Sequence, residues 1–247
     1  MTINSLKNQL DSFKKTGHCT VKDAISKEKL KLLNSYIVEV IDYLKENGDE
    51  GIYVNYANKK NKLVNSIHRI NELKHKGINT FIDENNFKEI AQYLIGEECE
   101  LFSIQAFLKP PGIGLRTPAH QDNAYWCLEE GKKAITIWLS LDKAGKFNGM
   151  MKYAINSNNS LVEHISSSNT PGSSLIIPED NLNCYEWRQP DLDPGDLSIH
   201  DGLVIHFSEK NNSNFARRGF LLNYKSVKNK KDVNKFNAYI SKLEKIY

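Results

Sequence analysis

The stretch "HQDNAYW", from His120 to Trp126, places an imidazole and a carboxylate one residue apart. In a β-strand, residues i and i+2 project from the same face, so His120 and Asp122 are expected to lie side by side. Two histidines and one carboxylate form the facial triad that holds non-haem Fe(II) and leaves coordination positions open. A histidine–carboxylate pair alone is a weak signal, since so short a motif often occurs by chance. The hypothesis therefore needs a second histidine from elsewhere in the chain.

The segment "PGDLSIHDGLVIHFSEKNNSNFARR" supplies that histidine and a basic pair behind it. His206 is followed 11 and 12 residues later by Arg217 and Arg218, at the start of the next expected strand. A guanidinium binds a carboxylate in a planar, bidentate way, so it could anchor the far end of a dicarboxylate that chelates the metal. His200 is an alternative third ligand, and Arg218 is an alternative anchor because neighbouring strand residues face opposite sides. The spacing by itself leaves both choices open.

Together with "AITIWLSLDKA" and "NGMM" between Ala134 and Met151, these segments resemble the phytanoyl-CoA dioxygenase family. The N-terminal "LDSFKKTGHCTVKDAISKEKLKLLNSYI" is similar to that family's opening helix, extended piece and second helix, so the resemblance covers nearly the whole chain. It implies an Fe(II)- and 2-oxoglutarate-dependent oxygenase that uses O₂ and releases succinate and CO₂. By the same resemblance, the iron ligands are His120, Asp122 and His206.

The resemblance also assigns a cosubstrate site. Arg217 stands at the family's usual offset and would bind the far carboxylate of 2-oxoglutarate. Ser208 would add a hydrogen bond to that carboxylate, while Thr136 and Trp138 would line the cosubstrate pocket. A carboxylate at Asp122 favours hydroxylation, because related halogenating enzymes have a small residue there and leave the position to chloride.

Three further residues are expected in the substrate pocket. Gln105 is a polar residue within an otherwise apolar run, and Tyr125 and Trp126 directly follow the histidine–carboxylate pair. For the two aromatic residues, packing in the core is an equally good interpretation, since aromatic side chains line pockets and cores alike. The stretch "NGMMKYAINSNN", 148–159, keeps the family's Asn-Gly turn but replaces its Pro-Gly-Ser-His element, so substrate contacts of that region cannot be carried over.

The arrangement of apolar residues predicts a mainly β fold with flanking helices. Apolar spacings of three and four predict a helix that starts after Ser26 and stops at Gly48. Five later segments, rich in β-branched and aromatic residues, read as strands: 100–112, 134–141, 173–178, 196–208 and 217–226. Such strands without long intervening helices favour an antiparallel jelly roll.

We therefore predict a double-stranded β-helix (jelly-roll, cupin-like) core behind a helical N-terminal third. The chain is expected to form one domain over 1–247. This domain divides into a helical part at about 1–96, the core at about 97–227 and a closing helix at about 231–246.

Composition excludes several other classes of protein. The net charge is +3, with 33 basic and 30 acidic residues spread among one another, which argues against a nucleic-acid-binding stripe. The N-terminus lacks the apolar region of a signal peptide, and no run of about 18 apolar residues suggests a membrane span. The cysteines form no close metal-binding or disulfide spacing: Cys19, Cys99, Cys127 and Cys184.

These observations predict a cytoplasmic enzyme whose partner is a small polar metabolite, with neither nucleic acid nor a membrane involved. No basic motif for a coenzyme A moiety stands out. Amino-acid-like compounds, phosphonates and natural-product intermediates fit better as substrates. The alternative hypotheses are a non-catalytic jelly-roll binding protein, or an enzyme with another metal and no 2-oxo acid.

Overall fold

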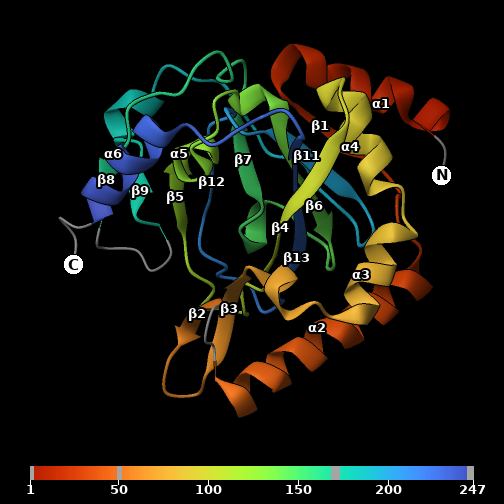
Figure 1. The fold of residues 1–247 in the computed structure, drawn as a ribbon. Coiled ribbons are helices and arrows are strands. Elements are labelled where there is room, and N and C mark those ends of the chain that lie inside the picture. The colour runs from red at the N-terminus through yellow and green to blue at the C-terminus, as the bar shows by residue number, and fades with distance from the viewer. Residues whose placement is uncertain (1–2, 49–51, 168–172, 244–247) are drawn as a thin grey trace.

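The computed structural model describes residues 3–48, 52–167 and 173–243 (Figure 1). Its strands are β1 (His18–Val21), β2 (Tyr53–Asn58), β3 (Leu63–His68), β4 (Cys99–Phe107), β5 (Thr117–His120), β6 (Ala134–Ser140), β7 (Met151–Ala154), β8 (Ile165–Ser166), β9 (Leu175–Ile176), β10 (Trp187–Arg188), β11 (Leu197–Asp201), β12 (His206–Ser208) and β13 (Gly219–Ser226). Its α-helices are α1 (Ile3–Thr16), α2 (Lys27–Asn47), α3 (Lys76–Asp83), α4 (Phe87–Ile95), α5 (Asn123–Trp126) and α6 (Val233–Leu243). Short 3₁₀ turns lie at Ile70–Leu73, Gly131–Lys133, Lys146–Asn148 and Glu179–Leu182.

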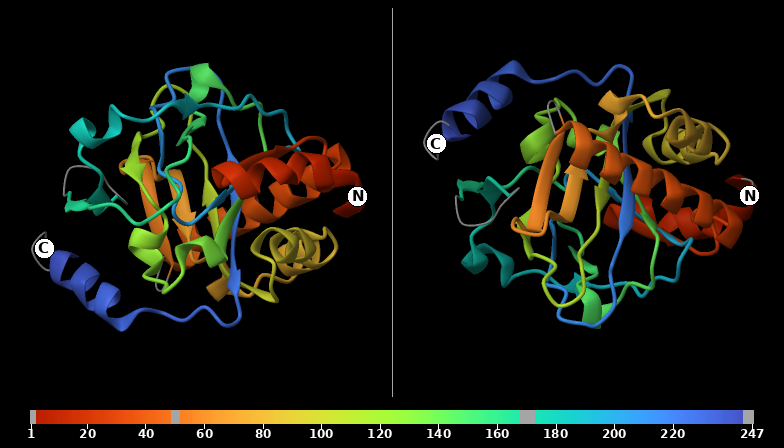
Figure 2. Two further views of the ribbon diagram at one scale, coloured as in Figure 1. Left: turned by 90° about the horizontal axis from the view of Figure 1, so that it is seen from above. Right: turned by 90° about the horizontal axis from the view of Figure 1, so that it is seen from below.

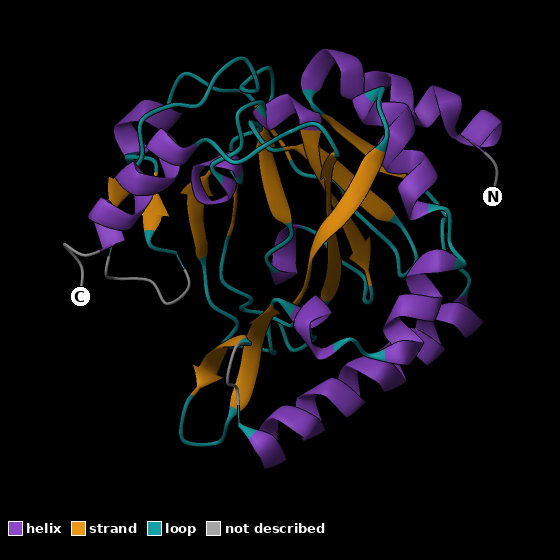
Figure 3. Cartoon of the chain, in the orientation of Figure 1, coloured by secondary structure: helices purple, strands orange, loops and turns teal. Residues whose placement is uncertain are grey.

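Two antiparallel sheets form the core. The larger has seven strands in the order β1-β11-β6-β13-β4-β3-β2, and the smaller has four in the order β10-β7-β12-β5. Their inner faces pack together, because Trp138 and Leu221 of the large sheet share an apolar cluster with Met151 and Tyr153 of the small one. Figure 3 shows the strands enclosed on one flank by helices. Strands β8 and β9 form a separate two-stranded sheet.

Helices α1 to α4 cover the outer face of the large sheet, as the two views of Figure 2 show. Strand β6 illustrates why: Ile135, Ile137 and Leu139 point outward into one apolar cluster with the helices. Since successive strand residues alternate in direction, Thr136 and Trp138 point inward. The outward-facing apolar residues of β6 thus pack against the helices, and its inward-facing residues, Thr136 and Trp138, can line an interior site.

The helix signals in the sequence are confirmed at both ends of α2. The Ser26 side chain accepts a hydrogen bond from the backbone N–H of Lys29, and Gly48 follows the last turn with φ +80°. A left-handed φ of this kind favours glycine, which has no Cβ to clash.

The predicted helical N-terminal third is matched only loosely, because besides α1 to α4 and the expected extended piece, here β1, it contributes the unpredicted β2–β3 hairpin. β1 pairs with β11, while the β2–β3 hairpin joins the other edge of the large sheet through β4. The hairpin's apolar residues at Val54, Val64 and Ile67 are separated by polar ones. This mixed pattern does not show the regular alternation of apolar and polar residues that indicates a strand. The pairing with β4 decides the structure of the segment, since strand formation depends on neighbouring strands more than on local preference.

The predicted strands are present but shorter. The segment 196–208 forms two strands, β11 and β12, and 173–178 keeps just β9. The closing helix is observed as α6, and residues 244–246 of that prediction lie outside the described residues. None of the helices in the described part of the chain has the length and apolar character that crossing a bilayer requires.

Gly219, the first residue of β13, lies directly against the Trp138 indole, and a Cβ at this position would overlap that ring. Trp138 is fully buried and cannot swing aside. We expect Gly219→Ala to destabilise the protein by about 1–3 kcal/mol, the usual cost of overpacking. Urea unfolding measures this, and Trp138→Phe in the Gly219→Ala background should recover part of the loss because the smaller ring frees space. Unchanged stability of Gly219→Ala would contradict the packing described here.

Candidate metal and cosubstrate site

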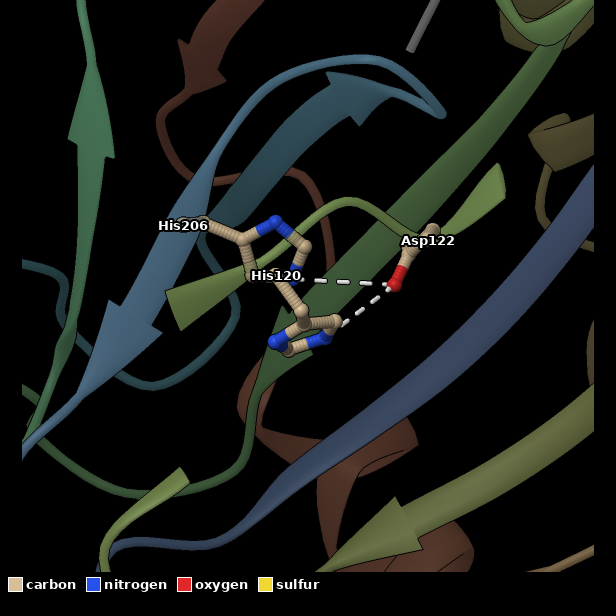
Figure 4. A group of neighbouring side chains, drawn as sticks. All are labelled: His120, Asp122 and His206. Carbon is tan, nitrogen blue, oxygen red and sulfur yellow. Dashed lines mark ion pairs between the residues drawn. The ribbon is translucent and has the colours of Figure 1, made fainter. Parts of the chain in front are cut away.

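Three side chains converge between β5 and β12 (Figure 4). His120 ends β5, and His206 begins β12 directly opposite it in the ladder. Asp122 Oδ1 lies 3.5 Å from His120 Nε2 and 3.6 Å from His206 Nε2. One ligand atom from each residue lies within 4.8 Å of the others, close enough to hold a single metal ion.

The structure corrects the reason why His120 and Asp122 meet. Strand β5 ends at His120, and Asp122 has helical dihedral angles (φ −57°, ψ −36°) as the residue before α5. The carboxylate therefore reaches the histidine from a helical turn and not from the same face of a strand.

Backbone carbonyls fix the orientation of both imidazoles. His120 Nδ1 lies 2.8 Å from the carbonyl oxygen of Pro118, and His206 Nδ1 lies 3.0 Å from that of Val204. A carbonyl oxygen can accept a hydrogen bond but cannot donate one, so each Nδ1 carries the proton. Each Nε2 then presents its lone pair toward Asp122, which is the tautomer that a metal ligand needs.

The electrostatics keep this donor set in its ligating form. Burial lowers the pKa of His206 well below its usual range, and the neighbouring His120 and His200 lower it further. Burial raises the pKa of Asp122, but His206, His120 and His200 outweigh that effect and hold it well below its usual range. Two imidazoles and one carboxylate are the donor set of non-haem Fe(II), and they fit that ion.

His200, the alternative ligand, lies just behind the carboxylate. Its Nε2 is 3.1 Å from Asp122 Oδ2, and the Thr136 hydroxyl donates to the same oxygen at 2.6 Å. Both contacts are to Oδ2, whereas Oδ1 faces His120 and His206. His200 is thus placed to orient the carboxylate from outside the three-residue group.

Arg217 is a buried cation with little to neutralise it. Its side chain is 1% exposed, and within the described residues no carboxylate lies at ion-pair distance and Nε has no hydrogen-bond partner. One terminal nitrogen donates to the Gly149 carbonyl at 2.6 Å, and the guanidinium lies over the Trp138 ring, 5.5 Å from its centroid. Burial lowers the pKa of Arg217 to about 10, so it remains charged at neutral pH. An unpaired buried charge is costly, and an anionic ligand would satisfy it.

Arg218 faces the other way, as neighbouring strand residues do. It makes a bidentate ion pair with Asp142, at 2.8 and 2.7 Å, on a partly exposed surface. This geometry separates the two arginines: Arg217 points into the interior, and Arg218 is already neutralised outside it.

Ser208 lies beside this region with an unexpected partner. The Lys109 ammonium, fully buried, donates to Ser208 Oγ at 2.8 Å and to the Glu209 carbonyl at 2.6 Å. Burial and then the nearby Arg217 lower the pKa of Lys109 well below its usual range. Because Oγ accepts from Lys109, the Ser208 hydroxyl proton is left to donate elsewhere.

A cavity of about 950 Å³ has the triad, His200, Ser208 and Arg217 in its wall. Its lining includes every predicted site residue: Gln105, His120, Asp122, Tyr125, Trp126, Thr136, Trp138, His206, Ser208 and Arg217. The two aromatic residues are partly buried and anchored: the Tyr125 hydroxyl donates to the Leu175 carbonyl at 2.8 Å, and Trp126 packs edge-on against Phe102. They form part of the cavity wall, which combines the two interpretations left open for them.

Sequence reasoning missed two residues at this site, Lys109 and Asn223, and the role of a third, His200, which it named as an alternative ligand. Lys109 stands at the end of the apolar run "FSIQAFLK", and Asn223 interrupts "GFLLNY". Each is a polar residue within an apolar strand segment, the same signal that pointed to Gln105. The role of His200 as a partner of Asp122 had no such signal, because it depends on the pairing of β11 with β6.

Comparison with known proteins agrees with this geometry. The family model described as phytanoyl-CoA dioxygenase (PhyH) matches residues 13–219, most of the chain. The chain belongs to the phytanoyl-CoA dioxygenase family. The predicted family is thereby confirmed, and the predicted reaction class is the one that its description names.

Two curated family relatives match part of the chain. A 2-aminoethylphosphonate dioxygenase from the uncultured bacterium HF130_AEPn_1 is 29% identical over 150 residues, which cover 61% of this chain and 55% of that protein. A phytanoyl-CoA dioxygenase domain-containing protein 1 homolog from Caenorhabditis elegans is 23% identical over 155 residues, which cover 60% of this chain and 52% of that protein. The matched part of the chain thus spans about half the length of these relatives.

Solved structures confirm the fold. The non-haem α-ketoglutarate-dependent carbocyclase SnoK from nogalamycin biosynthesis superposes with a TM-score of 0.76 at 19% identity, covering 94% of this chain and 88% of that one. EctD from S. alaskensis, solved with 2-oxoglutarate and 5-hydroxyectoine, superposes with a TM-score of 0.74 at 18% identity, covering 91% and 77%. The predicted jelly-roll core with flanking helices is therefore correct, and the helical N-terminal third is matched only loosely.

Proposed function

We propose that this member of the phytanoyl-CoA dioxygenase family is an Fe(II)- and 2-oxoglutarate-dependent dioxygenase. It hydroxylates an unactivated C–H bond of a small polar metabolite and releases succinate and CO₂. His120, Asp122 and His206 would hold the iron, and Arg217 would hold the far carboxylate of 2-oxoglutarate with help from Ser208.

The observation that carries this proposal is one cavity containing both a metal-binding triad and an unpaired buried arginine. A triad alone would suit several metals and reactions. An added guanidinium, with Nε free and an adjacent serine hydroxyl, matches a cosubstrate that has a carboxylate at the end away from the metal.

In this mechanism the protein supplies positions and a dry, shaped cavity. Bound Fe(II) would supply the activation of O₂ and the oxidative decarboxylation of the 2-oxo acid, which amino-acid side chains cannot perform. Arg217 and Ser208 orient the cosubstrate, and Trp138 keeps the guanidinium in place. Asp122 occupies a ligand position, which favours hydroxylation over halogenation.

The cavity lining supports a polar substrate with an anionic group. Three basic residues line the cavity: Lys59, Arg69 and Arg116. Among the described lining residues, Asp122 is the carboxylate that offsets them. Surface glutamates pair with Arg69 and Arg116, so the excess of positive charge is moderate. A relative bears the name of a 2-aminoethylphosphonate dioxygenase, and we therefore propose phosphonates and amino-acid-like compounds as the first candidates.

We also retain the proposals of one catalytic domain over 1–247 and of a cytoplasmic enzyme without nucleic-acid or membrane partners. All four cysteines are free thiols, which suits a reducing compartment.

Metal removal and reloading test the proposal. Protein stripped with a chelator should form no succinate from 2-oxoglutarate, and Fe(II) should restore slow formation in air that a true substrate accelerates. Candidate substrates are 2-aminoethylphosphonate, amino acids and, as a contrasting class, an acyl-CoA. Protein that binds Fe(II) but never forms succinate would favour a non-catalytic binding protein, and activity with another metal without 2-oxoglutarate would favour a different enzyme.

A further inference from the structure

A row of uncharged polar side chains crosses the inner face of the large sheet and ends on Asp122. Gln105 of β4, Asn223 of β13 and Thr136 of β6 lie on adjacent strands, with Asn223 directly opposite Thr136 in the ladder. Gln105 Nε2 donates to Asn223 Oδ1 at 2.8 Å, and Asn223 Nδ2 donates to Thr136 Oγ1 at 2.8 Å. Thr136 Oγ1 donates to Asp122 Oδ2 at 2.6 Å.

The direction of these hydrogen bonds is fixed by chemistry. An ionised carboxylate can only accept, so Thr136 must use its single proton on Asp122. Thr136 Oγ1 must then accept from the amide nitrogen of Asn223, which leaves the Asn223 amide oxygen to accept from Gln105. Thr136 and Asn223 are each 1% exposed, so water does not compete for these groups.

The row continues beyond Gln105 to the hairpin that closes the cavity. His68 of β3 hydrogen-bonds to Gln105, and its Nε2 lies 3.1 Å from Ser66 Oγ, which accepts from Asn55 of β2 at 3.0 Å. Burial lowers the pKa of His68 to about 4, so its ring is neutral and offers one donor and one acceptor. Hydrogen bonds therefore hold the far end of the row as well.

The two oxygens of Asp122 are thus separated by role. Oδ2 accepts from Thr136 and contacts His200, while Oδ1 faces the Nε2 atoms of His120 and His206. A carboxylate with one oxygen occupied in this way presents a single oxygen to a metal. Partners that orient a metal ligand from behind typically change metal affinity about 10- to 100-fold when removed.

We propose that Asn223 and Gln105 are positioning residues that fix the Thr136 hydroxyl, and through it fix Asp122 as a one-oxygen metal ligand. This inference rests on the proposed function, since it concerns the same metal site. It assigns Thr136 to the carboxylate, where the resemblance placed it at the cosubstrate, and it gives a specific role to Asn223, which the sequence marked no further than as a polar residue in an apolar strand.

The test is Fe(II) affinity, measured without oxygen by competition with a chromogenic chelator. Thr136→Val has nearly the shape of threonine but no hydroxyl, and we expect it to weaken Fe(II) binding about 10- to 100-fold. Thr136→Ser keeps the hydroxyl and should stay close to the wild type. Asn223→Asp keeps the side-chain shape but cannot donate to Thr136, so it should also weaken binding.

The double variant Thr136→Val/Asn223→Leu separates positioning from general damage. If Asn223 acts through Thr136, the double variant should bind Fe(II) no more weakly than Thr136→Val alone, whereas independent effects of Thr136→Val and of Asn223→Leu, each measured alone, would multiply. Ser140→Ala is the matched control, because Ser140 lies on β6 like Thr136, but its hydroxyl donates to the Asp142 carbonyl, outside both the row and the cavity lining. Its Fe(II) affinity should equal that of the wild type, and thermal unfolding verifies that every variant is folded.

Two outcomes overturn the inference in distinguishable ways. The positioning role alone is overturned if the wild type binds Fe(II) and folded Thr136→Val binds it with an affinity within about twofold of the wild type. It is also overturned if the wild type binds Fe(II) and the effects of the two substitutions multiply in the double variant. A folded wild type that does not bind Fe(II) overturns the proposed function and the positioning role with it.

Discussion

Replacement of Arg217 by leucine is expected to raise the 2-oxoglutarate concentration needed for half-saturation at least about 100-fold, which corresponds to about 2.7 kcal/mol. The guanidinium is buried, unpaired at Nε and held over Trp138, so a bound carboxylate would gain a desolvated, charge-assisted contact. Leucine fills part of the space but offers no donor. Succinate formation as a function of 2-oxoglutarate concentration measures the effect.

Arg218→Leu is the matched control. It removes the same side chain from the next position, where the guanidinium is paired with Asp142 on the surface. We expect at most about 1 kcal/mol of lost stability and an unchanged 2-oxoglutarate requirement, since exposed ion pairs contribute little. An equal effect of both substitutions, or none at Arg217, would show that the anchor has been assigned to the wrong residue.

His206→Ala should abolish both Fe(II) binding and iron-dependent succinate formation. The substitution removes one of the two proposed histidine ligands, whose Nε2 atoms face Asp122 Oδ1. The loss should exceed the roughly 10- to 100-fold decrease in metal affinity that removal of an outer partner typically causes. Metal content after anaerobic loading and gel filtration gives the direct readout.

His200→Ala provides the comparison, because it truncates an equally buried histidine that contacts the other oxygen of the same carboxylate. Fe(II) should still bind, about 10-fold more weakly, with Thr136 continuing to hold Asp122. The reverse order, with iron lost in His200→Ala and kept in His206→Ala, would make His200 the third ligand.

Much of this site could be predicted because its members are rare residue types at fixed spacings. His120, Asp122, His206 and Arg217 all meet in one cavity, and the glycine and serine that bound α2 appear where the sequence places them. The reason for the meeting could not be read correctly, since Asp122 adopts a helical turn just past the end of β5.

The rest depends on contacts between distant segments. Strands β2 and β3 form because an edge of the large sheet is available to them, and local pattern did not reveal that edge. Lys109 donates to Ser208, which lies 99 residues away in the sequence, and Asn223 donates to Thr136, which lies 87 residues away. These contacts define the part that each residue plays in the site. Single polar residues in apolar strands pointed to such positions, but their partners were visible only in the structure.

The most direct test of the central claim is anaerobic absorption spectroscopy of the protein with Fe(II) and 2-oxoglutarate. Chelation of iron by the 2-oxo acid in the triad should give a visible metal-to-ligand charge-transfer band in the wild type, and this band should be absent from folded Asp122→Ala. A wild type that shows no band, or an Asp122→Ala variant with an undiminished one, would contradict an iron site built on His120, Asp122 and His206.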